Sequence, residues 1–251
     1  MLKTSYKKIV WGLIGIALAG FCIWGVQWAT YTRPPLPEAV EALRSDDLVT
    51  VTDTPWLTFT PAQNSPDTGF IFYPGGRIDP RGYSSLMRAM SEKGYLVVVP
   101  KMPINMAIFN SNIADEIIGA HPEIKHWVIG GHSVGGTAAA QYTFAHPDQI
   151  SGLAIWSSYP ADGSDISSLN IPVVLLYGGN ETGVTDESVS ARKHLLPSDT
   201  QYIKIEGGDH HQFGSYLLTT EEKLATISRE VQHVQILSAM VELLQSIVEG
   251  Q

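Results

Sequence analysis

The sequence predicts an α/β fold, a mainly parallel and twisted β-sheet with helices on both faces, preceded by an N-terminal transmembrane helix. Three observations lead to it. Short apolar runs that fit buried strands alternate with segments of helical periodicity. A G-x-S-x-G stretch lies between one such strand and one such helix. An uncharged apolar segment near the N-terminus is long enough to cross a bilayer.

Composition limits the classes of function. The 251 residues, 44% hydrophobic and 16% charged, suit one folded domain of moderate size. The net charge is −9, and without Lys3, Lys7 and Lys8 the remaining 13 basic and 25 acidic groups give −12. Such an acidic body argues against a nucleic-acid partner. The single cysteine, Cys22, excludes an intrachain disulfide and a cysteine-based metal site.

The N-terminal segment Ile9–Trp28 is predicted to span a membrane, and residues 1–31 to form a single-pass anchor. Three lysines precede it, which favours a cytoplasmic N-terminus and a domain outside the cell membrane. Aromatic residues at its end fit the membrane interface: Trp24, Trp28 and Tyr31. A cleaved signal peptide is the alternative, but no small-residue cleavage site follows. Phe21 before Cys22 argues against a lipoprotein site.

Residues 32–46 are predicted as a spacer that leads into the domain. Pro34, Pro35 and Pro37 favour an extended chain, and residues 38–43 a short helix. The domain is expected over residues 47–251.

Strands and helices alternate through the domain. Strands are predicted at 48–51, 56–60, 69–73, 95–99, 127–129, 152–156, 171–177 and 201–205. Helices are predicted at 83–93, 106–120 and 134–145, and a long one ends the chain. Thr219 with Glu222 resembles a capping box before that last helix, for which a break near Ser228 is left open. No helix separates the first two strands, so an antiparallel start is expected.

Residues 127–136, which read WVIGGHSVGG, carry the chemistry. In the strand–turn–helix context, Ser133 is predicted to stand on a strained turn at the carboxyl edge of the sheet. Gly131 and Gly135 are expected there because a side chain would collide with the neighbouring strand and helix. The helix N-terminus would favour negative charge developing at Ser133. These features point to a nucleophilic serine.

A serine nucleophile needs a base and an orienting acid. Where the serine stands on a strand–turn–helix motif of this kind, the two follow it along the chain in the order acid, then histidine. His210 is the predicted base, with His211 as the rival, because a Gly-rich loop after the last strand holds this pair. Glu181, early in the loop after strand 171–177, is the predicted acid. Asp186 is its rival, more readily explained as a helix cap, and Asp209 is a third candidate.

An oxyanion hole requires two backbone N–H groups. Val134, which follows the serine, is expected to supply one. The loop after strand 69–73 should supply the other, from Gly75 or Gly76, since Pro74 has no N–H.

Three motifs together resemble those of the α/β-hydrolase superfamily. They are Tyr73-Pro74-Gly75-Gly76 with Asp79-Pro80 and Tyr83, the run from Gly131 to Gly136, and the run from Gly207 to Gly214. The chain from about Leu48 onward is similar to the small, lidless bacterial "alpha/beta hydrolase fold-5" group, which is akin to dienelactone-hydrolase-like proteins. One departure is Glu181, where that family usually carries Asp.

The resemblance and the residues imply a serine hydrolase that cleaves a carboxylic ester or related small acyl compound. A non-catalytic binding or sensor protein on the same fold, or an acyltransferase acting on a cell-envelope acceptor, are the alternatives. No metal or organic cofactor is implied. The short connection over residues 157–170 leaves little room for a lid, so an open site is expected.

Overall fold

A computed structural model describes residues 2–219, 222 and 224–249. The chain forms two compact units, Met1–Thr32 and Arg33–Gln251.

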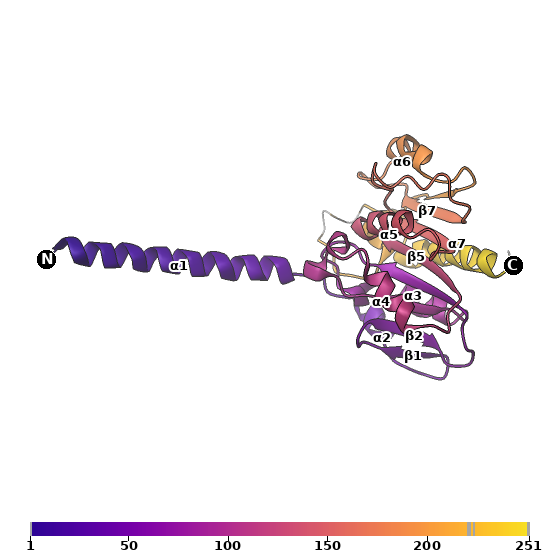
Figure 1. The fold of residues 1–251 in the computed structure, drawn as a ribbon, viewed down its shortest axis with the longest axis horizontal. Coiled ribbons are helices and arrows are strands. Elements are labelled where there is room, and N and C mark those ends of the chain that lie inside the picture. Colours follow the sequence, from indigo (N-terminus) through magenta and orange to yellow (C-terminus); the bar gives the residue numbers. More distant parts are fainter. Residues whose placement is uncertain (1, 220–221, 223, 250–251) are drawn as a thin grey trace. The chain divides into compact units, whose positions relative to one another are not determined.

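The first unit is a single helix, α1, Leu2–Thr30 (Figure 1). Its segment Val10–Trp28 has a mean hydropathy of 1.8 and is long and apolar enough to cross a membrane. The prediction of an N-terminal candidate transmembrane helix is therefore confirmed. The C-terminal helix α7, Arg229–Glu249, also passes this test, but apolar side chains on one of its faces, such as those of Ile236, Met240 and Leu244, pack into the core of the second unit.

The second unit is built on one eight-stranded sheet with the order β1-β2-β4-β3-β5-β6-β7-β8. The first two strands pair antiparallel, β2 also pairs antiparallel with β4, and every later pair is parallel. The strands are β1 Val49–Thr52, β2 Leu57–Pro61, β3 Thr68–Tyr73, β4 Leu96–Val99, β5 His126–His132, β6 Gly152–Trp156, β7 Val173–Gly178 and β8 Gln201–Ile205. The predicted mainly parallel sheet with an antiparallel start is confirmed.

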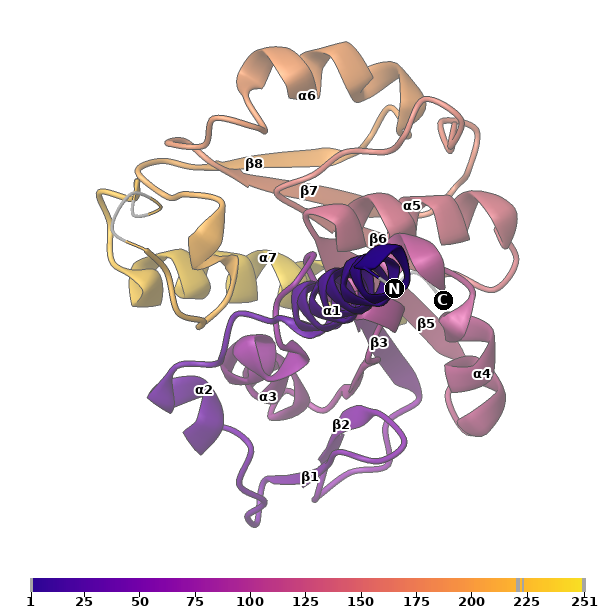
Figure 2. The same ribbon diagram turned by 90° about the vertical axis from the view of Figure 1, so that its left-hand side faces the viewer.

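Helices cover both faces of the sheet (Figure 2). On one face, α3 (Ser84–Ser91) and α7 pack with side chains such as Phe70 and Phe72. On the other, α4 (Ile113–Ala120), α5 (Val134–Ala145) and α6 (Asp186–Arg192) enclose a second core that includes Ile71. Successive residues of β3 face opposite cores, as the alternation of side chains along a strand requires.

The segment that follows α1 is joined to the domain at its first residue. Arg33 forms a parallel bridge with Ile78, and Pro35 an antiparallel bridge with Tyr216. The Arg33 guanidinium also forms a two-pronged ion pair with Glu222. The short helix α2, Pro37–Glu41, then buries Ala39.

Two helix predictions differ from the structure. The predicted helix 106–120 is divided into a 3₁₀ turn, Ala107–Phe109, and α4. The last helix begins at Arg229, just after the possible break near Ser228. The backbone N–H groups of Leu224 and Ala225 donate to Asp209 Oδ2. Because this carboxylate competes with helical hydrogen bonding, these residues are not part of the helix. The backbone N–H of Thr219 donates to the Glu222 carboxylate, as in a capping box, although residues 220, 221 and 223 lie outside the described residues.

Candidate active site

Ser133 occupies a sharp turn between β5 and α5. Its backbone has φ 54° and ψ −127°, a conformation that is costly for any residue with a Cβ. A Cβ added to Gly131 would lie 2.5 Å from the carbonyl carbon of Gly135, and one added to Gly135 would overlap the Tyr73 carbonyl oxygen. The two glycines therefore permit the close packing of helix and strands that the turn needs.

Ser133 and His210 line the same open depression, of about 260 Å³. The other lining residues are Val134, Thr137, Ser157, Ser158, Tyr159, Gly183 and Val184. Within the described part of the chain, no hydrogen bond joins the Ser133 hydroxyl to His210, and such looser geometry is common in a site without substrate. His211 does not line this depression, although its ring lies edge-on to that of His210.

Glu181 is the carboxylate next to His210. Its Oε2 lies 3.4 Å from His210 Nδ1, and its Oε1 accepts a hydrogen bond from the Gly178 N–H at 2.5 Å. The Glu181 side chain is fully buried and that of His210 is partly exposed. The structure thus places the predicted acid and base together, with the carboxylate on the side of the imidazole that faces away from solvent.

Ser157, which the sequence did not single out, lies between these two groups. Its hydroxyl donates to Glu181 Oε2 and also contacts His210 Nδ1 in a short hydrogen bond. A hydroxyl has one proton, so when it donates to Glu181 it can only accept from the Nδ1–H of His210. Ser157 is buried and has φ 47°, which shows that the fold holds it in a strained conformation.

Asp186 lies away from His210. Its carboxylate accepts hydrogen bonds from Lys204 Nζ at 2.9 Å and from the Tyr177 hydroxyl at 2.7 Å, and these two bonds lower its pKa. It is the first residue of α6, and the residue that caps this helix is Thr185, one position earlier than predicted, in a reciprocal pair with Ser188.

Asp209 forms hydrogen bonds that hold the loop around His210. Its buried carboxylate accepts hydrogen bonds from four backbone N–H groups, those of His211, Gln212, Leu224 and Ala225. These bonds fold the chain around the carboxylate and fix the loop that carries His210.

The two candidate glycines of the oxyanion hole differ in one respect. The Gly75 N–H donates to the Tyr83 hydroxyl oxygen at 3.1 Å. Gly76 lies against Val134, since a Cβ added to it would be 3.3 Å from Val134 Cγ1. Across the described residues, the N–H groups of Gly76 and Val134 donate no hydrogen bond outside their own elements. They are therefore the better-placed pair of donors.

His132, immediately before the serine, joins the two loops of the site. Its Nε2 lies 2.9 Å from the His210 carbonyl oxygen, which can only accept, so the proton is on Nε2. Its Nδ1 then accepts from the Tyr83 hydroxyl at 2.8 Å, and that hydroxyl accepts from Gly75. Burial lowers the pKa of His132 well below its ordinary value and raises that of Tyr83, so both stay neutral.

Strained backbone gathers around the depression. The described non-glycine residues with positive φ are Arg77, Ile104, Asn105, Ser133 and Ser157. Ser133 and Ser157 line the depression, and the backbone N–H of Arg77 donates to the Asn105 carbonyl beside Gly76. Conformations of this kind persist where the surrounding structure enforces them, which is typical of functional sites.

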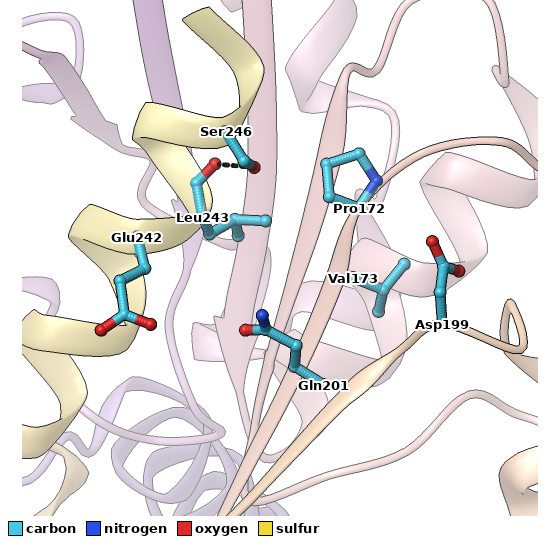
Figure 3. Close-up of a pocket in the computed structure, with 7 residues that line it drawn as sticks. All are labelled: Pro172, Val173, Asp199, Gln201, Glu242, Leu243 and Ser246. Carbon is cyan, nitrogen blue, oxygen red and sulfur yellow. Dashed lines mark hydrogen bonds between the residues drawn. The ribbon is translucent and has the colours of Figure 1, made fainter. Parts of the chain in front are cut away.

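A separate cavity of about 180 Å³ lies at the opposite edge of the sheet, where β7 and β8 begin (Figure 3). Its lining residues come from β7, β8, the residues just before these strands and α7: Pro172, Val173, Asp199, Gln201, Glu242, Leu243 and Ser246. Ligands of open α/β sheets bind at the carboxyl ends of the strands, so this cavity is not at the expected place.

The comparisons with known proteins agree with this fold. A family model described as "Alpha/beta hydrolase family" matches residues 69–234, which is more than half of the chain. This chain belongs to the alpha/beta hydrolase family. The match covers the turn at Ser133 and the loop of His210. No curated protein sequence matches this chain.

Solved structures show the same fold at low sequence identity. A predicted CIB-like hydrolase from Thermoplasma acidophilum is 15% identical, with a TM-score of 0.59 over 78% of this chain and 99% of its own. Est1E from Butyrivibrio proteoclasticus, with ferulic acid bound, is 12% identical, with a TM-score of 0.57 over 78% and 98%. A putative dienelactone hydrolase from Klebsiella pneumoniae is 17% identical, with a TM-score of 0.55 over 76% and 95%. The chain therefore shares its fold with these hydrolases and esterases.

Proposed function

We propose that this alpha/beta hydrolase is a serine hydrolase that cleaves a carboxylic ester or related acyl compound through an acyl-enzyme. The proposal rests mainly on one observation: three side chains lie near one another at the carboxyl edge of the sheet. Ser133 stands on its strained turn, His210 lines the same depression, and the buried Glu181 carboxylate faces His210 Nδ1. The solved structure of Est1E with ferulic acid also supports an acyl substrate.

In the proposed reaction the Ser133 oxygen attacks the acyl carbon while His210 Nε2 takes its proton. Glu181, with Ser157 between them, holds the Nδ1–H in the required tautomer and stabilises the imidazolium. The N–H groups of Val134 and Gly76 stabilise the negatively charged oxygen of the acyl group by hydrogen bonds. The imidazolium then gives its proton to the leaving alcohol, and water hydrolyses the acyl-enzyme by the same route.

A fluorophosphonate probe tests this reaction, because it reacts with activated serines. The full-length chain should be labelled at Ser133, and Ser133→Ala should abolish both labelling and turnover of short acyl esters. The matched control is Ser238→Ala, on an exposed serine of α7, which should be labelled like the wild type. Equal labelling of Ser133→Ala would refute the proposal, and a wild type that is neither labelled nor active would favour the binding-protein alternative.

We propose further that α1 is an uncleaved membrane anchor, with residues 1–8 in the cytoplasm and the hydrolase domain outside. Its apolar length and the three preceding lysines support this topology. An alkaline phosphatase fused after residue 251 should be active, and a green fluorescent protein at the same point should stay dark. The opposite pair of results would refute the topology, and a chain shortened at its N-terminus would refute the uncleaved anchor.

A further inference from the structure

The segment that follows α1 lies beside the loop after β3, residues 74–77, which contains Gly76 and is here called the proposed oxyanion loop. The Arg33 N–H donates to the Arg77 carbonyl at 2.8 Å, and the Asp79 N–H donates back to Arg33 at 3.2 Å. Arg77 follows directly after Gly76. The first residue of the domain is thus hydrogen-bonded to the loop at which negative charge would develop.

The covalent distance from α1 to this point is short. Only Tyr31 and Thr32 separate the last residue of α1, Thr30, from Arg33. At 3.8 Å for each step between Cα atoms, Arg33 lies at most about 11 Å from Thr30. This limit comes from chain length alone and holds for any orientation of the helix. If α1 spans a membrane, the loop beside Arg33 is held near the lipid headgroups, whose layer is about 5–8 Å deep on each side.

An exposed apolar loop, Pro103–Phe109, lies on the other side of Arg77. The Arg77 N–H donates to the Asn105 carbonyl at 2.8 Å, and Met106 lies against Gly76. The exposed side chains of this loop are those of Ile104, Ile108 and Phe109, the last being 58% exposed. Ile104 and Asn105 both have positive φ, so the fold holds the loop in a strained form that leaves Ile104 in solvent. Leu217, also exposed, donates its N–H to the Pro34 carbonyl.

The charge of the domain decides what such a surface can bind. Outside the first eight residues the chain carries a net charge of −12, so anionic headgroups would repel it. Binding to a membrane must then come from the anchor and from apolar side chains that enter the interface. The depression at Ser133 is open and about 260 Å³, too small to enclose a long acyl chain, whose remainder would stay in the lipid.

We infer that the apolar loop, Pro103–Phe109, rests in the interface of the membrane that holds α1, and that Ser133 acts on ester groups of lipids in that membrane. This rests on the proposed function and names its substrate class. The segment that begins at Arg33 and the apolar loop are both hydrogen-bonded to the backbone of Arg77, next to Gly76. A membrane that holds α1 would therefore lie close to the loops that flank Ser133.

The position of the loop is tested without any assay of activity. In the full-length chain, Cys22→Ser removes the only cysteine, and Phe109→Cys or Phe144→Cys then takes a polarity-sensitive fluorophore. Phe144 is 48% exposed and lies near the end of α5, about 16 Å along the helix from Ser133, which makes it a matched control. In phosphatidylcholine vesicles, nitroxide-labelled lipid should quench the fluorophore at position 109 several-fold more than that at 144. Equal quenching would overturn the inference.

The substrate class is tested in the same vesicles with a fluorogenic diacylglycerol, beside a short water-soluble ester. Phe109→Asp should lower the ratio of lipid to soluble-ester turnover at least about tenfold, whereas Phe144→Asp should leave it unchanged. An unchanged ratio in Phe109→Asp, with Ser133 still labelled by fluorophosphonate, would overturn this inference and leave the serine mechanism standing. Loss of fluorophosphonate labelling in the wild type would instead count against the proposed function.

Discussion

His132 donates a hydrogen bond from Nε2 to the backbone carbonyl oxygen of His210 over 2.9 Å. The residue before the proposed nucleophile thereby holds the backbone of the proposed base. On its other side His132 accepts from Tyr83, which in turn accepts from Gly75. One chain of three hydrogen bonds, two of them buried and the third partly buried, therefore links the loop of Gly75, the turn at Ser133 and the loop of His210.

Removing the Tyr83 hydroxyl should weaken this chain. Tyr83→Phe leaves the Gly75 N–H and His132 Nδ1 without partners, which should cost about 1–3 kcal/mol in the free energy of unfolding. We also expect a lower kcat on a short ester, because the loops lose their mutual support. Tyr216→Phe is the matched control, since this buried hydroxyl has no hydrogen-bond partner among the described residues. Denaturant unfolding that shows equal losses in both variants would contradict the role of Tyr83.

The choice between the two candidate acids has a kinetic test. Glu181→Gln keeps the shape of the side chain but removes the charge beside His210 Nδ1, so kcat should fall by about 10³–10⁴ with KM little changed. Asp186→Asn disturbs only the bonds to Tyr177 and Lys204 and should keep nearly the full rate. Steady-state kinetics that gave the reverse ranking would transfer the acid role to Asp186.

The Ser157 hydroxyl should contribute to rate and not to substrate binding. Ser157→Ala removes the group between Glu181 and His210, and we expect kcat to fall about tenfold with KM unchanged. Ser157→Gly removes the same hydroxyl and also relieves the positive φ, so it should be as slow as the alanine variant but more stable. Wild-type kcat in both variants would show that the bridge has no role in catalysis.

Two helical glycines should respond to alanine in opposite directions. Gly135→Ala places a Cβ against the Tyr73 carbonyl oxygen and should destabilise the fold by about 2 kcal/mol or more. Gly119→Ala, in α4, meets nothing within 4 Å and should stabilise by up to about 1 kcal/mol through helix propensity. Thermal unfolding of the two variants compares them, and a harmless Gly135→Ala would show that the turn can relax.

The ion pair between Arg33 and Glu222 should make stability depend on acid pH. The Arg33 hydrogen bonds lower the Glu222 pKa from 4.5 to about 2, so the pair stabilises the folded state above pH 4.5. That contribution is lost as the pH falls from 4.5 to about 2. Glu222→Gln should therefore unfold at a lower temperature than the wild type at pH 6, with a smaller difference at pH 2.5. Glu187→Gln, on an exposed side chain, should show little difference at either pH.

Local patterns in the sequence predicted most of the fold. The buried strands are nearly continuous apolar runs, and the nucleophile turn requires glycines at fixed spacing, so both could be predicted. The start of α7 could not, because Asp209 captures the N–H groups of Leu224 and Ala225 from a distant position in the chain.

The missed parts of the site depend on which strands are neighbours. Ser157 is an ordinary serine in a loop, and it reaches Glu181 only because β6 and β7 lie side by side. The choice of Gly76 over Gly75 depends on Tyr83, which comes from the 3₁₀ turn before α3. One signal for Ser157 was available in the sequence. Ser157 directly follows β6, and the carboxyl ends of adjacent parallel strands lie at the same edge of a sheet.

The bridge between Arg33 and Ile78 also determines where this protein can be cut without harm. A protease acting between Thr30 and Arg33 would release a fragment that begins at residue 31, 32 or 33 and keeps every hydrogen bond of the bridge. A cut only a few residues later would remove the strand partner of the loop at Arg77, and with it the ion pair to Glu222. Release of the intact domain is thus confined to the three peptide bonds between Thr30 and Arg33.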